Sequence, residues 1–401
     1  MEKSQNKRST YLITGTICLL FIGVIYAWSI LKQPLCQEFN WTVRQEAANY
    51  TVTIWFFVAG IYLSGFISRR CSRTRIACAG IAVTGCAYIL TSLFLKGNIL
   101  FLYVFYGALS GLGTGLAYSA LVAFITSCYP ERKGLSSGIL MTGFGASTLV
   151  LGSLVSALLK RGIGWRTAFL GLGTALLLLS IVELLVFRGS SERRDTDKME
   201  VMENNEETDR DAPSKVMLRK ASFWRFFIYC TFLSAVGSFV ISFGRELFLS
   251  SGTSETLAVT LVGCLSVCNG LGRLLCGTLC DRIGVRKAML TSCVIVLFSV
   301  AALFAAICGR ISLCAIIGAC LVGLSYGFCP TVTSVFSREK FGNKYFGTNY
   351  SIASSTLLPA SLTVTLIGTL LQKTNSFPVC LAVLFVFSCI AFVCSLIPEK
   401  K

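Results

Sequence analysis

Histidine is missing from this 401-residue sequence, and charged residues make up only 14% of it. Without histidine the chain lacks the usual general base, the commonest metal ligand and the usual Ser-His or Cys-His nucleophile systems. The 19 cysteines include no Cys-x-x-Cys pair, the spacing of many metal and redox sites. These absences argue against an enzyme, and we expect no cofactor and no metal.

The low charge is matched by 54% apolar residues and a mean hydropathy of +0.72. A soluble domain of this size would not hide so much apolar surface. Apolar runs of about twenty residues recur along the chain, and each is long enough to cross a bilayer as a helix. The sequence therefore predicts an all-α membrane protein with twelve transmembrane helices. The expected spans are 11–31, 47–67, 76–95, 99–128, 134–159, 165–187, 223–249, 256–280, 288–308, 311–336, 346–371 and 377–397.

Lysine and arginine residues are distributed unevenly over the two sides of these spans. Of the 36, 26 lie on the side that holds both chain ends and a long polar segment, and nine, including Lys32, lie on the other. Positive loops stay in the cytoplasm, so both termini are expected to be cytoplasmic in a multi-pass plasma-membrane protein, most simply of a bacterial inner membrane. The net charge of +17 thus reflects topology, and no nucleic-acid partner is expected.

The spans divide into six and six around the polar segment. This predicts an N-terminal half over 1–187, a cytoplasmic linker over 188–222 and a C-terminal half over 223–401. Two sequence echoes at nearly constant offset support homologous halves: Gly65–Arg75 with Gly277–Lys287, and Glu131–Ser137 with Lys344–Tyr350.

The segment from Gly277 to Lys287 reads G-x-x-x-D-R-x-G-x-R-K, and with it the chain resembles the major facilitator superfamily. The resemblance implies two pseudo-symmetric six-helix halves and secondary transport. In the first-half copy Arg69 stands where the family places its aspartate. We expect Asp281 to pair with arginines or a helix N-terminus and to hold one conformation until the halves rock apart. The predicted conformational-gating motif consists of Gly277, Asp281, Arg282, Gly284, Arg286 and Lys287.

Three shorter motifs resemble the oxalate/formate antiporter family, which is related to the monocarboxylate transporters. They are Tyr26-Ala-Trp28-Ser-Ile-Leu-Lys32-Gln-Pro34-Leu, Asn269-Gly-Leu-Gly-Arg273 and Gly347-Thr-Asn-Tyr350. This resemblance implies that Arg273 binds the substrate carboxylate. The oxalate transporter of that family adds a lysine on helix eleven, but the matching stretch here has no basic residue, and Leu357 occupies the approximate position.

Arg273 is also the one basic residue that we place inside a span. A charge there costs at least about 2.5–3.5 kcal/mol, so it needs a partner, a wet cavity or a function. Asn269 lies one turn earlier on the same helix face. The planar guanidinium matches a carboxylate with two hydrogen bonds. The alternative is a structural ion pair, although neither Glu183 nor Glu246 lies at an obvious matching depth.

We predict that Asn269, Tyr26, Trp28, Tyr118 and Tyr326 line the substrate site with Arg273, since a tyrosine in lipid needs a partner for its hydroxyl. Bonding to a neighbouring backbone carbonyl is the alternative for each tyrosine. One fixed positive charge suits a monocarboxylate such as formate, lactate or pyruvate better than a dianion.

The expected function is therefore transport of small organic anions by alternating access, with exchange and proton coupling both left open. The alternatives are an efflux transporter for drugs or uncharged metabolites, in which Arg273 is structural, and a non-transporting sensor. The expected partners are a small carboxylate and the lipid bilayer, with the chain acting as a monomer.

Two rows of small residues predict close helix packing. One is the ladder Gly107, Gly111 and Gly115, and the other is a ridge of cysteines around Gly272, formed by Cys264, Cys268, Cys276 and Cys280. A thiolate metal site is the alternative for the cysteines.

Overall fold

The computed structural model describes residues 2–68, 70–129, 133–188, 211–342 and 345–397, which form helices and no strand. Twelve helical segments are long and apolar enough to span a membrane, and together they confirm the predicted number. These are Arg8–Phe39, Val43–Ile67, Arg73–Phe94, Ile99–Ser127, Ser136–Lys160, Trp165–Val186, Ala221–Ser250, Glu255–Ile283, Val285–Gly309, Ser312–Phe341, Thr348–Thr374 and Phe377–Leu396.

Several of the first six spans contain a change of helix type. Their elements are α1 (Glu2–Ile22), the 3₁₀ segment η1 (Gly23–Ala27), α2 (Trp28–Phe39), α3 (Val43–Ile67), α4 (Arg73–Phe94), α5 (Ile99–Phe101), the π-helical η2 (Leu102–Ser110), α6 (Gly111–Ser127), α7 (Lys133–Ser147), the π-helical η4 (Thr148–Gly152), α8 (Ser153–Lys160) and α9 (Trp165–Val186).

The last six spans follow the short helix α11 (Ser214–Met217). They are built from α12 (Ala221–Ser250), α13 (Glu255–Ile283), α14 (Val285–Gly309), α15 (Ser312–Phe341), α16 (Phe346–Ser354), α17 (Leu357–Thr374) and α18 (Phe377–Leu396).

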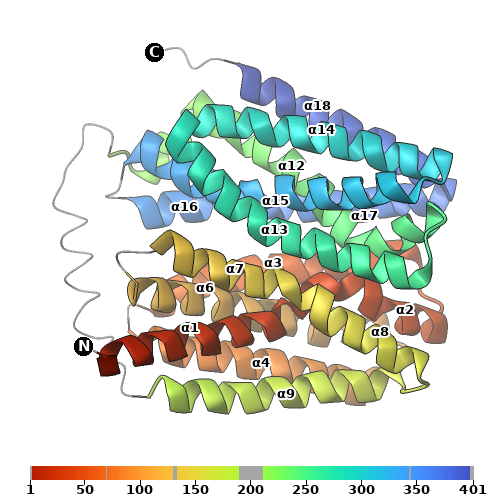
Figure 1. Ribbon diagram of the computed structural model, residues 1–401, viewed down its shortest axis with the longest axis horizontal. Helices are drawn as coiled ribbons and strands as arrows, with labels where there is room; N and C mark the ends of the chain where they lie inside the picture. Colours follow the sequence, from red (N-terminus) through yellow and green to blue (C-terminus); the bar gives the residue numbers. More distant parts are fainter. Residues whose placement is uncertain (1, 69, 130–132, 189–210, 343–344, 398–401) are drawn as a thin grey trace.

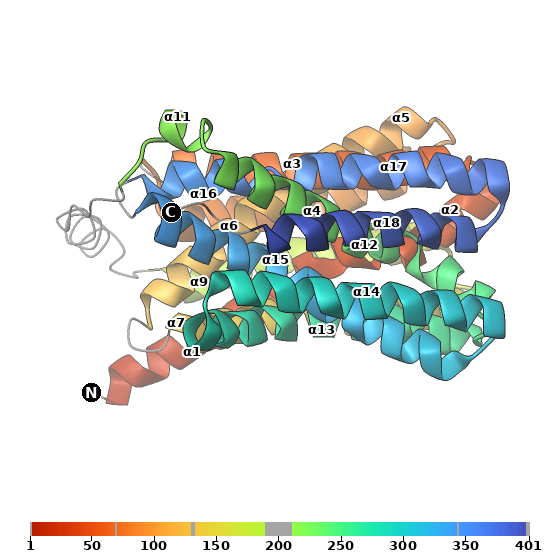
Figure 2. The same ribbon diagram turned by 90° about the horizontal axis from the view of Figure 1, so that it is seen from above.

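The two sets of six spans lie side by side, the first below and the second above in Figure 1. They meet where α3 packs on α17 and where α7 packs on α13, and Figure 2 shows the first of these pairs along one edge of the bundle. α1 begins and α18 ends at the same end of the bundle, which we call the terminal end; the other is the opposite end. Large apolar side chains such as Phe298 and Leu366 are exposed on the outside, as expected of a surface that faces lipid.

The first span is longer than predicted. Its helix continues through α2 to Phe39, past the expected end at residue 31, although Pro34 lies inside it. Lys32 is therefore enclosed within the bundle and only 1% exposed. Our placement of Lys32 outside the spans, and of Arg273 as the one basic residue inside them, is wrong. The reason is that Lys32 has acidic partners, described below, that stabilise its charge at this depth.

The predicted glycine packing is confirmed. A Cβ atom on Gly111 would overlap the carbonyl oxygen of Thr53, and one on Gly115 would overlap that of Phe57. Only glycine lets α6 approach the backbone of α3 so closely. The cysteine ridge serves the same purpose on α13, where a Cβ on Gly272 would overlap the carbonyl oxygen of Leu324 on α15.

We predict that Gly115→Ala lowers the free energy of unfolding by about 1–3 kcal/mol, because the added methyl forces α3 and α6 apart. The matched control is Gly171→Ala on α9, where a Cβ meets nothing within 4 Å. Denaturant unfolding of both purified variants in detergent would check this, and equal stabilities would contradict the close packing.

Candidate functional site

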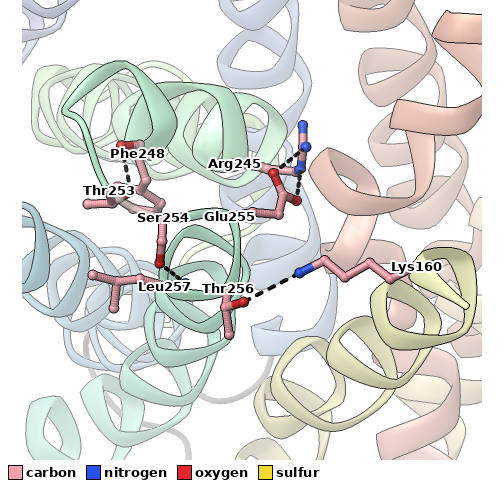
Figure 3. A network of polar contacts seen from close by, with 8 residues as sticks. All are labelled: Lys160, Arg245, Phe248, Thr253, Ser254, Glu255, Thr256 and Leu257. Carbon is pink, nitrogen blue, oxygen red and sulfur yellow. Dashed lines mark hydrogen bonds and ion pairs between the residues drawn. The ribbon is translucent and has the colours of Figure 1, made fainter.

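Arg273 is held by a helix that packs against both sets of spans. Ser254 caps the start of α13, where its Oγ accepts a hydrogen bond from the Leu257 amide at 3.3 Å (Figure 3). Further along, a Cβ on Gly270 would lie 3.1 Å from the Met141 carbonyl oxygen on α7, while Gly272 faces α15. Because α7 belongs to the first six spans and α15 to the last six, α13 lies at the interface between them.

The Arg273 guanidinium reaches across this interface. Its Nη1 donates a hydrogen bond to the hydroxyl of Tyr118 on α6, and lies 2.6 Å from the sulfur of Met141 on α7. Its Nε–H is buried without a hydrogen-bond partner in the described part of the chain. Among the described residues no carboxylate lies within ion-pair distance of Arg273. The Nε–H of this partly buried cation therefore has neither a hydrogen-bond acceptor nor a carboxylate beside it among the described residues.

Tyr26 lies beside this cation, in the stretch where the first span changes its helix type. The 3₁₀ turn η1 places the Tyr26 hydroxyl close to Arg273. Phe144 of α7 orients two tyrosines, since its ring lies 5.1 Å from that of Tyr26 and 5.1 Å from that of Tyr118, both edge-on. Such contacts fix the direction in which each hydroxyl points.

Two further tyrosines come from the last six spans. Tyr326 of α15 packs against the bare backbone of Gly237 on α12, where a Cβ would overlap its ring. Tyr326 and Tyr350 of α16 both lie close enough to interact electrostatically with Arg273. The cation is thus surrounded by phenol groups, which donate or accept hydrogen bonds without adding charge.

Asn269 and Trp28 occupy different surroundings. Asn269 is 2% exposed one turn before Arg273, and its Nδ2 has no hydrogen-bond partner within the described residues. Trp28 packs with Tyr106, with ring centres 4.9 Å apart, and no contact with Arg273 is found in the described chain.

Four predicted residues, Arg273, Tyr26, Tyr118 and Tyr326, are therefore brought together, and Trp28 is not. Sequence reasoning missed Met141, which carries no recognisable signal. It also missed Tyr350, although that residue closes one of the quoted motifs.

A second buried charge cluster was missed entirely. The Nζ of Lys32 on α2 lies 3.2 Å from Oε2 of Glu46 on α3 and 3.3 Å from Oε1 of Glu246 on α12. It also lies 4.2 Å from the centre of the Phe243 ring. We call Lys32, Glu46 and Glu246 the triad. Its sequence signal was a lysine inside a quoted motif and a glutamate one residue before the expected start of the second span.

Polar contacts also link helices at the opposite end of the bundle (Figure 3). Arg245 on α12 donates from Nε and Nη2 to the two carboxylate oxygens of Glu255 on α13, at 2.8 and 2.6 Å. Lys160 on α8 lies 3.4 Å from the Thr256 hydroxyl on α13, so the two sets of spans are in contact here. A pocket of about 510 Å³ opens beside these groups, lined by residues that include Gln33, Lys160 and Glu255.

The predicted gating motif forms the connection between α13 and α14 at the terminal end. Gly284 has φ +82°, a conformation that favours glycine, and it separates the two helices. Arg286 donates to the carbonyl oxygen of Leu396 on α18. Asp281 is exposed and has no ion-pair partner in the described part of the chain. Position 69, where the first-half copy departs from the pattern, lies outside the described residues.

A family model supplies the decisive comparison for this twelve-helix chain. The model of the Major Facilitator Superfamily matches residues 13–363 and 230–401. The chain belongs to the Major Facilitator Superfamily. Its family and fold are those of membrane transporters and not of enzymes, as the sequence predicted.

Curated relatives in this superfamily include two bacterial transporters of similar length. The uncharacterized MFS-type transporter YhjX of Escherichia coli is 26% identical over 88% of this chain and 86% of its own. The oxalate:formate antiporter of Oxalobacter formigenes is 25% identical over 88% of this chain and 82% of its own. Human monocarboxylate transporter 14 is 26% identical over 42% of this chain and 32% of its own.

The fold is similar to solved superfamily structures. A bacterial homolog of the human lysosomal transporter Spinster, in an inward-facing and occupied conformation, aligns with a TM-score of 0.71 and 18% identity over 97% of this chain and 96% of its own. A D-xylose-proton symporter aligns with a TM-score of 0.70 and 17% identity over 96% and 95%.

The bond between Arg273 and Tyr118 predicts energetic coupling across the interface. In a double-mutant cycle, Arg273→Gln and Tyr118→Phe should be non-additive by roughly 0.5–3 kcal/mol in unfolding free energy, because each removes the same hydrogen bond. The control pairs Arg273→Gln with Tyr103→Phe, whose hydroxyl donates instead to the Gln45 carbonyl. Additivity in both cycles would contradict the contact.

Proposed function

We propose that this protein is a secondary transporter of small monocarboxylates, in which Arg273 binds the substrate carboxylate. The observation that carries this proposal is the buried, unpartnered Nε–H of the Arg273 guanidinium, whose Nη1 already contacts Tyr118 and Met141. A guanidinium presents two parallel N–H groups along the edge that includes Nε, the geometry that a carboxylate accepts. A bound carboxylate would satisfy both the charge and the unpaired donor.

The charge of the surroundings favours a monoanion. Lys32 and Arg245 are also buried cations in the described chain, but both already pair with carboxylates. The segment from Tyr350 to Ser361 contains no basic residue. A dianion at Arg273 would therefore leave one negative charge without a partner in a medium of low polarity. Formate, lactate and pyruvate are the size and charge class that we propose.

Alternating access follows from where the site lies. Arg273, Tyr326 and Tyr350 come from the last six spans, whereas Tyr26, Tyr118 and Met141 come from the first six. We propose that these sets, 1–187 and 223–401, move as two halves joined by the linker 188–222 and rock around the bound carboxylate. Neutralising Arg273 lowers the cost of closing the halves over a buried charge.

We further propose that the terminal end faces the cytoplasm of a bacterial plasma membrane. The excess of lysine and arginine on that side supports this orientation. In it, the segment from Gly277 to Lys287 lies at the cytoplasmic ends of α13 and α14, where it would control their separation.

Counterflow of labelled pyruvate into proteoliposomes tests the proposal. Native protein should give saturable counterflow, and Arg273→Gln should weaken the apparent affinity by roughly 10- to 150-fold, the equivalent of losing a charged hydrogen bond worth about 1.5–3 kcal/mol. Arg161→Gln, an exposed arginine in the turn between α8 and α9, is the matched control and should leave counterflow unchanged.

Two outcomes would contradict the proposal. Saturable oxalate exchange without any response to monocarboxylates would refute the assignment of substrate charge. Equal counterflow by native protein and Arg273→Gln would make Arg273 structural and favour efflux of uncharged or cationic compounds.

A further inference from the structure

The end of the predicted linker lies against the terminal end of the last six spans, where Figure 2 shows α11 above α16. We call residues 211–217, which include α11, the strap. The buried Ala212 donates its amide hydrogen bond to the carbonyl oxygen of Phe341, the last residue of α15, at 3.1 Å. A Cβ on Gly342 would overlap the Asp211 carboxylate, so the two segments also pack closely. The strap is therefore fixed to the end of α15.

Asn349 joins the strap to the next helix, α16. Its side chain is fully buried. Its Nδ2 donates a hydrogen bond to the Ala212 carbonyl oxygen at 2.9 Å, and its Oδ1 accepts one from the Ser214 hydroxyl at 2.8 Å. Removing this amide would leave a buried carbonyl group of the strap unpaired, which is costly. Asn349 stands in the motif Gly347-Thr-Asn349-Tyr350, and the function proposed above gives it no role.

The same helix carries Tyr350 to the substrate site. Successive residues of a helix point about 100° apart, so Tyr350 faces a different side of α16 from Asn349. That side brings Tyr350 close enough to Arg273 to interact electrostatically. α16 has only nine residues, and a turn at 355–356 separates it from α17. Because of this turn, α17 alone does not set the rotation of α16 about its axis, and the strap supplies a further constraint.

α16 is also bonded to the first six spans. The hydroxyl of Tyr62 on α3 donates a hydrogen bond to the carbonyl oxygen of Ser351. If the two sets of spans separate at the terminal end, α16 must give up either this bond or its contacts with the last six spans. The strap favours the second set, as does the guanidinium of Arg338 on α15, which lies 4.3 Å from the centre of the Phe346 ring.

We propose that Asn349 is a positioning residue through which the strap fixes α16 and keeps Tyr350 beside Arg273. The strap makes α16 move with the last six spans, so Tyr350 stays at the substrate site when the halves rock. An α16 released from the strap would rotate, and its phenol would leave the carboxylate. The effect on substrate rests on the function proposed above, whereas the attachment of α16 to the strap does not.

Hydrogen–deuterium exchange of the purified full-length protein tests this attachment without a substrate. Asn349→Ala and the milder Ser214→Ala should each accelerate amide exchange in α16 roughly 2- to 12-fold, the effect of losing a neutral hydrogen bond, while α18 exchanges at the native rate. Lys215→Ala, an exposed residue of the strap, is the matched control and should leave α16 unchanged. Native exchange of α16 in both Asn349→Ala and Ser214→Ala would overturn the proposal, whatever the substrate.

A double-mutant cycle on pyruvate affinity tests the positioning role. Tyr350→Phe and Asn349→Ala should each weaken binding by roughly 2- to 12-fold. Because Asn349 acts through Tyr350, adding Asn349→Ala to Tyr350→Phe should cause no further loss. Native affinity of Asn349→Ala, or two factors that multiply, would overturn the positioning role. Accelerated exchange of α16 in a protein that binds no pyruvate would support the attachment to the strap and refute only the proposed substrate.

Discussion

The arrangement of this protein depends on one physical constraint: a guanidinium must stay charged inside a membrane-spanning bundle. Arg273 meets it at the interface between the two sets of spans, with a phenol and a thioether beside Nη1 of the cation. Close packing of α13 against α7 and α15 at Gly270 and Gly272 makes that position possible. The helix backbone is thereby fixed, while the Nε–H of the cation has no partner among the described residues.

The two charge clusters differ in the sign of their uncompensated charge, which is positive around Arg273 and negative around Lys32. Around Arg273 the protein supplies neutral donors and acceptors and leaves a positive charge to be neutralised. Around Lys32 it supplies more carboxylate than one amine balances. Each cluster draws groups from both sets of spans, so relative movement of the spans changes the surroundings of both.

Much of the fold could be predicted from sequence because each span is recognisable from its own run of apolar residues. The close packing of the fourth span could be predicted from its glycines, which recur every four residues. The central arginine and its tyrosines were also predictable, since polar side chains at bilayer depth require partners. The triad was not, because Lys32 and Glu246 are 214 positions apart and their pairing depends on how α2 meets α12. Trp28 follows Tyr26 closely in the same motif but packs with Tyr106, because proximity in a motif does not determine the face on which a side chain packs after the 3₁₀ turn.

The most direct test of the central claim is calorimetric titration of the purified protein with pyruvate. We predict one site for each chain, loss of the binding heat in Arg273→Gln, and partial retention in Arg273→Lys, which keeps the charge but not the planar fork. The same heat in native protein and Arg273→Gln would contradict the account, because the carboxylate would then bind without the guanidinium on which the site is built.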